Sequence, residues 1–254
     1  MKAQATIHHH LDLALRLLDS VTGRVIEERN VTFLPQSPGS VPIPRGAGMY
    51  LFVNSGREDF DMEVRVYGYE PQRVRITFPP VEKQMPICQI YLLPLDNPVR
   101  NHILTLRGKL PGIEAMEAVS LMDANCCIKE FDARKRIMTV LNQRNVRFHH
   151  VHYGLINRER TAYEHFEVEK EISTQEIKCK QKLEQEFQIN QPITRVIFGQ
   201  TTEQGDYVLK VANDEIAQYL VRFVVDGKVF YQRVDFHQEG NRLICEEAAQ
   251  EKED

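Results

Sequence analysis

The sequence lacks tryptophan, long apolar runs and an apolar leader. Large aromatic rings supply flat apolar surface, so the absence of tryptophan argues mildly against a sugar-binding site. No uncharged apolar stretch approaches the roughly 18 residues that a membrane-spanning helix requires. Three histidines and Asp12 interrupt the first twenty residues, which therefore hold no signal-peptide core. We expect a protein without membrane contact that is cytoplasmic, or that is exported without a leader as part of a particle.

Cysteine pairs and an excess of one charge are also missing. The five cysteines are an odd number without C-x-x-C spacing, which favours free buried thiols in a reducing compartment over a disulfide framework. A net charge of −4 gives no general attraction to nucleic acid or to anionic lipid. Nucleic acid is therefore disfavoured as a partner, unless a local patch binds it.

No catalytic motif is recognisable. The sequence contains no G-x-S-x-G elbow, H-E-x-x-H helix, P-loop or dinucleotide fingerprint. Cys126 and Cys127 follow a turn-like segment, but no nearby residue marks a base that would activate a thiol. We expect a protein that is not an enzyme and uses no cofactor. An enzyme with a novel site stays open, and a deep pocket with converging polar groups would support it.

The dominant pattern is an alternation of apolar and polar residues with period two. It runs through 11–17, 60–66 and 73–78. Successive side chains of a strand point to opposite faces, so each run has one apolar and one solvated face. This pattern is typical of antiparallel sheets with one wet face rather than of parallel sheets buried on both sides. It predicts an all-β fold.

The composition of the connecting segments divides the chain. The proline- and glycine-rich stretch 35–48 predicts a long loop, and the segment around 94–98 has the composition of a linker. We expect tandem β-sandwich domains with a β-rich middle segment, which is either a third domain or part of the next one. The segment 177–189 alternates like a strand but has the polar composition of a helix, and we favour the strand. The expected parts are a sandwich at 11–95, the middle segment at 100–160, an Ig-like sandwich at 161–240 and an acidic disordered tail at 241–254.

Short motifs in the first part resemble a known module. Asp19 and Thr22-Gly23-Arg24 precede a strand, a loop then ends in Gly48 and Tyr50, and a later strand closes on Tyr67-Gly68-Tyr69-Glu70. Together these motifs resemble the carboxypeptidase-regulatory, transthyretin-like (prealbumin-like) β-sandwich module, over residues 11–95 only. The proline-rich loop is longer than that pattern usually allows. The resemblance implies a non-catalytic module for stability, spacing or docking, and it carries no site residues.

A histidine cluster is the one candidate metal site. His149, His150 and His152 lie close in sequence, and on a strand His150 and His152 share a face. Neutral imidazoles bind zinc well, but no further ligand has a recognisable spacing. Solvated or packed histidines are the commoner outcome.

A basic stretch at 129–160 carries eight positive charges against three negative ones, with aromatic residues between them. Such interleaving suits a protein that binds single-stranded nucleic acid. A solvated strand face, or a surface that binds an acidic protein partner, would explain the same charges. We favour protein docking. The candidate partner-binding residues are Arg134, Lys135, Arg136, Arg144, Arg147, Phe148 and Tyr153.

The expected all-β fold and the lack of a catalytic motif favour a structural or adaptor subunit. We expect it to dock on other protein subunits, including copies of itself, within a larger assembly. A phage-tail-like or contractile particle is the preferred type, on an analogy of fold alone. The alternative is a binding module for single-stranded nucleic acid or a metal at residues 129–160.

Overall fold

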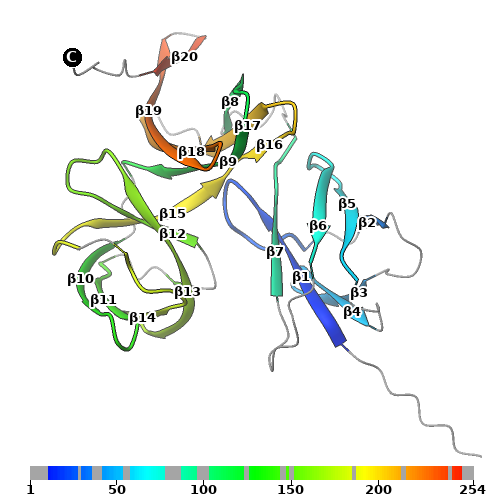
Figure 1. Cartoon of the computed structure of the whole chain (residues 1–254), viewed down its shortest axis with the longest axis horizontal. Coiled ribbons are helices and arrows are strands. Elements are labelled where there is room, and N and C mark those ends of the chain that lie inside the picture. The colour runs from blue at the N-terminus through cyan, green and yellow to red at the C-terminus, as the bar shows by residue number, and fades with distance from the viewer. Residues whose placement is uncertain are drawn as a thin grey trace, which may run out of the picture. The chain divides into compact units, whose positions relative to one another are not determined.

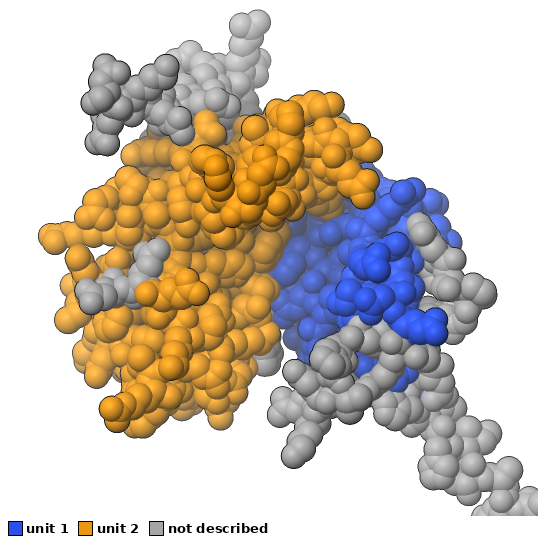
Figure 2. Space-filling view, viewed as in Figure 1, with its two compact units in different colours: residues 1–97 blue, residues 98–254 orange. Residues whose placement is uncertain are grey.

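The computed structural model describes residues 11–27, 30–35, 42–53, 58–77, 87–95, 103–122, 126–143, 147–148, 152–184, 187–212, 216–239 and 242–247. Within these ranges the chain forms twenty strands and no helix (Figure 1), so the expected all-β fold is confirmed. No helix there could cross a membrane. The chain divides into two compact units, residues 1–97 and 98–254 (Figure 2), which we call unit 1 and unit 2.

Unit 1 contains two sheets. Their strand orders are β3-β4-β1-β7 and β2-β5-β6. The strands are β1 (Leu11–Asp19), β2 (Val31–Pro35), β3 (Ile43–Gly46), β4 (Met49–Val53), β5 (Phe60–Val66), β6 (Gln72–Ile76) and β7 (Ile87–Leu92). Apolar side chains from both sheets form one buried cluster, to which β1 contributes Leu13, Leu15 and Leu17 and β5 contributes Met62 and Val64.

The expected alternation holds in β5 but fails in β1. In β5 the apolar residues are buried, while Asp61 and Arg65 are exposed. In β1 the intervening Asp12 and Ala14 are also buried, and Arg16 is half-buried. The reason is position: β1 is an inner strand between β4, which is antiparallel, and β7, which is parallel. The prediction of a purely antiparallel sheet with one wet face is therefore wrong for this sheet.

Unit 2 contains a ten-stranded sheet and a three-stranded one. The orders are β10-β11-β14-β13-β12-β15-β9-β18-β19-β20 and β16-β17-β8. The strands are β8 (Ile103–Lys109), β9 (Ile113–Ser120), β10 (Cys126–Asp132), β11 (Ile137–Leu141), β12 (His152–Ile156), β13 (Tyr163–Ser173), β14 (Glu176–Cys179), β15 (Pro192–Phe198), β16 (Gln200–Thr201), β17 (Asp206–Ala212), β18 (Ile216–Val225), β19 (Lys228–Glu239) and β20 (Arg242–Glu247).

Six of these strands close on themselves. β10 also pairs with β15, so β10, β11, β14, β13, β12 and β15 form a closed antiparallel ring. Backbone hydrogen bonds between Ile128 and both Asn190 and Gln191 support the closure. All six strands contribute to one buried cluster, including Met138, Phe166 and Ile193. We call this part of unit 2 the six-strand ring.

The rest of unit 2 builds on the ring through β15. β15 pairs with β9, and β9 with β18, so the sheet continues beyond the ring. A second buried cluster combines residues of this extension, such as Met116 and Val221, with Leu104, Leu209 and Val211 of the three-stranded sheet. A third cluster, which includes Val119, Ile156 and Tyr163, joins β9 to β12 and β13.

Strands of 161–240 pair with strands of 100–160 in both the ring and its extension, and one compact unit holds both segments. Two smaller predictions for unit 2 differ from the structure. Of the described residues of the segment 177–189, only 177–179, the end of β14, are strand. The expected disordered tail from residue 241 is wrong over β20, because β20 pairs with the free edge of β19; residues 248–254 lie outside the described part.

Candidate functional site

The cations of the predicted partner-binding surface are scattered and mostly paired. Arg134 and Lys135 lie in the exposed turn between β10 and β11, where Asp132 Oδ1 accepts both backbone N–H groups at 3.0 Å. Arg136 lies 3.6 Å from Glu169, and Arg147 pairs with Glu171 at 2.6 Å. Arg144 lies outside the described residues. Ion pairs of Lys135 with Asp132, Arg136 with Glu169 and Arg147 with Glu171 therefore neutralise part of the charge that the sequence presents as a continuous basic stretch.

Phe148 and Tyr153 are not surface residues. They are 1% and 3% exposed, and both belong to the buried cluster of the six-strand ring. Their ring centroids lie 4.9 Å apart, so each packs against the other. A side chain buried in a core cannot offer its face to a nucleotide base or a partner, so their assignment as binding residues is wrong. The alternation of β12 directs Tyr153 inward and His152 outward.

Of the three candidate zinc ligands, the structure describes only His152. His149 and His150 lie outside the described residues. Nδ1 of His152 lies 2.8 Å from Nε2 of His165, and its ring also contacts Phe198 at a centroid distance of 5.0 Å. Within the described ranges, no group of three or more histidine, cysteine or carboxylate side chains could hold a metal ion.

His152 belongs instead to a polar network that the sequence did not reveal. Glu117 of β9 is 5% exposed, and its carboxylate lies between the side chains of Arg222 and His165. Arg222 Nη1 donates to Glu117 Oε1 at 3.0 Å, and His165 Nδ1 lies 3.0 Å from Glu117 Oε2. The sequence does not single out Glu117, because β9 carries two glutamates, of which Glu114 is exposed and Glu117 is buried. The network connects β9, β18, β13 and β12.

The protonation of this network follows from its surroundings. Burial raises the pKa of Glu117, but the hydrogen bond and charge of His165 and the charge of Arg222 outweigh it, so the pKa lies below its ordinary value. When both imidazoles are neutral, an ionised Glu117 accepts a hydrogen bond from Nδ1 of His165, and Nε2 of His165 accepts one from Nδ1 of His152. Burial also lowers the pKa of His152 well below its ordinary value, and Glu167 only partly opposes this. The contacts of Glu117 with Arg222 and His165 join β9 to β18 and β13, which fits a role in holding strands together.

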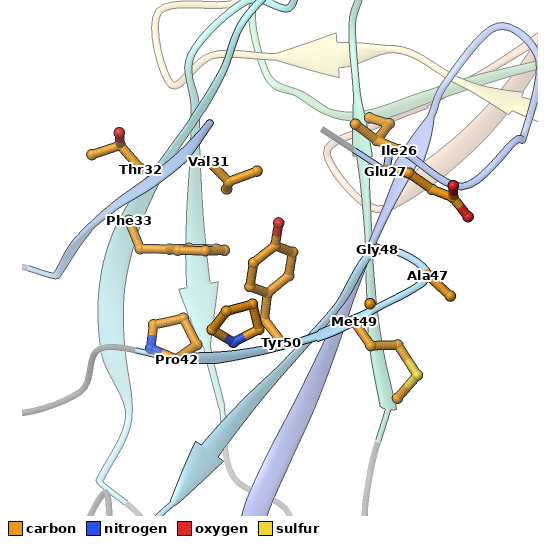
Figure 3. Close-up of a pocket in the computed structure, with 12 residues that line it drawn as sticks. Ile26, Glu27, Val31, Thr32, Phe33, Pro42, Ala47, Gly48, Met49 and Tyr50 are labelled. Atoms are coloured by element: carbon orange, nitrogen blue, oxygen red, sulfur yellow. The ribbon is translucent and has the colours of Figure 1, made fainter. Parts of the chain in front are cut away.

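A groove in unit 1 is the second candidate. It has a volume of about 710 Å³ and is lined by Ile26, Glu27, Val31, Thr32, Phe33, Pro42, Pro44, Gly46, Ala47, Gly48, Met49 and Tyr50 (Figure 3). Among the described residues of this lining, Glu27 is the only charged one. The rings of Phe33 and Tyr50 meet at a centroid distance of 4.8 Å and an angle of 63°. We call this feature the β2–β3 groove, because residues of both strands line it.

The groove lies where two sheets end. β2 and β3 are each the outermost strand of their sheet in the described part of unit 1. An outermost strand has a row of backbone N–H and C=O groups without a ladder partner. The β2–β3 groove therefore combines apolar side chains with strand edges, which are the two elements that bind an extended peptide.

The chain matches no family model, and a search of curated proteins gave no significant match.

Proposed function

We propose that this protein is a non-catalytic structural or adaptor subunit that docks on other proteins through the β2–β3 groove. The observation that carries the proposal is the apolar lining of this groove beside two outer strands. An extended segment of a partner would add a strand to β2 and place alternate side chains against Phe33 and Tyr50.

Of the four outer strands in the described part of unit 1, β2 and β7 carry no charged residue, and β2 is the one that lines the groove. On the opposite edge of the same sheet, β6 carries Arg73 and Arg75, which are exposed at alternate positions. Charges on an edge strand oppose pairing with another chain. β3 contains Pro44, which has no N–H, and its register shifts between Pro44 and Gly46. The first four residues of β2, Val-Thr-Phe-Leu, have no charge and no proline.

The finer parts of the proposal concern the domain type and the assembly. The two sheets of unit 1 share one buried cluster, which fits a transthyretin-like sandwich used for docking. A phage-tail-like or contractile particle is the assembly that we propose, on fold-level analogy.

Binding of an extended peptide tests this function. The probe is a fluorescein-labelled eight-residue peptide of alternating valine and threonine, titrated with the full chain and followed by anisotropy; sedimentation velocity detects self-association in parallel. We expect Thr32→Lys to weaken binding by about tenfold, because it places a charge on the β2 edge. Thr174→Lys adds the same charge in an exposed turn of unit 2 and is the matched control. Absence of both peptide binding and self-association, or equal losses in the two variants, contradicts the proposal.

A further inference from the structure

A second pocket lies in unit 2, at one end of the six-strand ring. Its volume is about 510 Å³. One wall is the turn between β12 and β13, which contributes Asn157, Arg158 and Arg160; the other is the segment before β15, with Ile189, Asn190 and Gln191. We call it the arginine pocket. It is separate from the β2–β3 groove, which unit 1 alone forms.

Hydrogen bonds fix both walls of the arginine pocket. Asn157 Oδ1 accepts the backbone N–H groups of Thr161 and Ala162 at 2.8 and 3.1 Å. On the other side, the backbone N–H of Asn190 donates to the carbonyl of Ile128 at 2.8 Å. The backbone of both walls is therefore preformed, whereas the exposed side chains of Arg158 and Arg160 would be ordered by the ligand.

Among the residues that the structure describes, the arginine pocket has a positive charge. Its described lining includes Arg158 and Arg160 but no carboxylate; Glu159 lies between them in the turn but outside the lining. Neither arginine has an ion pair with any other residue that the structure describes, unlike Arg136 and Arg147 of the same basic stretch. Amide groups of Asn157 and Gln191 supply further hydrogen-bond donors.

We propose that the arginine pocket binds an acidic segment of a partner protein, which deepens the proposed docking function and rests on it. Guanidinium groups bind carboxylates through two parallel hydrogen bonds, which gives both affinity and orientation. Ile189, which is 67% exposed, offers an apolar contact beside the charges. No aromatic ring is among the described lining residues, which therefore offer no stacking surface of the kind that single-stranded nucleic acid uses.

The test compares three labelled probes on the full chain by anisotropy. They are an eight-residue polyglutamate peptide, an eight-residue polylysine peptide and an eight-nucleotide oligothymidylate. The variant Arg158→Gln/Arg160→Asn removes both charges, and asparagine tolerates the left-handed backbone of position 160, where φ is +57°. The control Lys109→Gln/Lys228→Gln removes two charges from exposed positions of β8 and β19. Circular dichroism and urea unfolding verify that both variants fold.

We expect polyglutamate to bind and polylysine not to bind. The pocket variant should weaken polyglutamate binding by at least about tenfold, and the control variant by less than about twofold. Equal losses in the two variants would mean non-specific attraction and overturn the proposal, as would no binding of polyglutamate. Tighter, pocket-dependent binding of oligothymidylate would overturn it in favour of nucleic acid. Thr32→Lys changes the β2–β3 groove and leaves the arginine pocket intact. Loss of peptide binding at the groove is therefore distinguishable from loss of polyglutamate binding at the pocket.

Discussion

The hydroxyl of Tyr69 donates a hydrogen bond to Oδ2 of Asp19 at 3.0 Å, across 50 positions of the chain. Oδ1 of the same carboxylate accepts the backbone N–H of Thr22 at 2.7 Å. Asp19 is only 9% exposed, so these donors replace most of its contact with water. The contact joins the turn after β1 to the turn after β5, and both residues belong to the motifs that resemble the transthyretin-like module.

We expect Tyr69→Phe to destabilise unit 1 by about 1–2 kcal/mol, because it leaves one oxygen of a nearly buried carboxylate without its donor. The measurement is the urea concentration at the midpoint of the unfolding of unit 1. Tyr67→Phe removes the same hydroxyl two residues earlier, where the side chain is 82% exposed, and should leave the midpoint unchanged. Equal shifts in the two variants would show that the hydrogen bond contributes nothing.

Gly154 allows β9 to pack closely on β12. A Cβ atom at this position would lie 2.7 Å from Cγ1 of Val119 and 2.9 Å from Cδ2 of Tyr163, and both side chains are fully buried. We expect Gly154→Ala to lower the unfolding free energy by about 1–3 kcal/mol through overpacking. Val119→Ala removes the closest atom. The double variant should therefore lose less than the sum of the single losses; additive losses would place the cost of Gly154→Ala in the backbone instead.

The sequence predicts the strand class of this protein but not its sheet connections. Period-two patterns report the burial of one strand face, which is a local property, and β5 follows them. Burial of Asp12 depends on the neighbours that β1 acquires from β4 and β7. Closure of the six-strand ring depends on two residue pairs between β10 and β15, which no local pattern encodes.

The same limit applies to the candidate sites. His152 stands out in the sequence only beside His149 and His150, yet its contact is His165, which the pairing of β12 with β13 brings near. Glu117 and Arg222 meet because β9 and β18 pair in one register. Arg158 and Arg160 form part of the predicted basic stretch. The sequence does not show that they lie in the turn between β12 and β13, apart from the cations of that stretch that form ion pairs.

Loss of the Glu117 charge should weaken the contact among β9, β13 and β18. Glu117→Gln leaves Arg222 without its carboxylate, and the side chain of Arg222 is only 25% exposed. We expect the free energy of unfolding, measured in urea, to fall by about 1–3 kcal/mol. This is less than for a fully buried ion pair, because Arg222 and His165 reach water. Adding Arg222→Met should recover part of this loss. Glu130→Gln, at an exposed position of β10, is the control, and an equal effect there would contradict the assignment.

His152 makes the stability of unit 2 depend on pH. Burial lowers the pKa of its ring in the folded protein, whereas the unfolded chain has the ordinary value of 6.5. The unfolded state therefore binds more protons, so stability is full above that value and falls as the pH decreases below it. His152→Gln removes the titrating ring and keeps a donor for His165. Between about pH 7.5 and about pH 5.5, the urea midpoint should fall more steeply for the unmodified protein than for this variant. Parallel profiles would mean that His152 gains no proton on unfolding, which requires the folded histidine pair to be already charged.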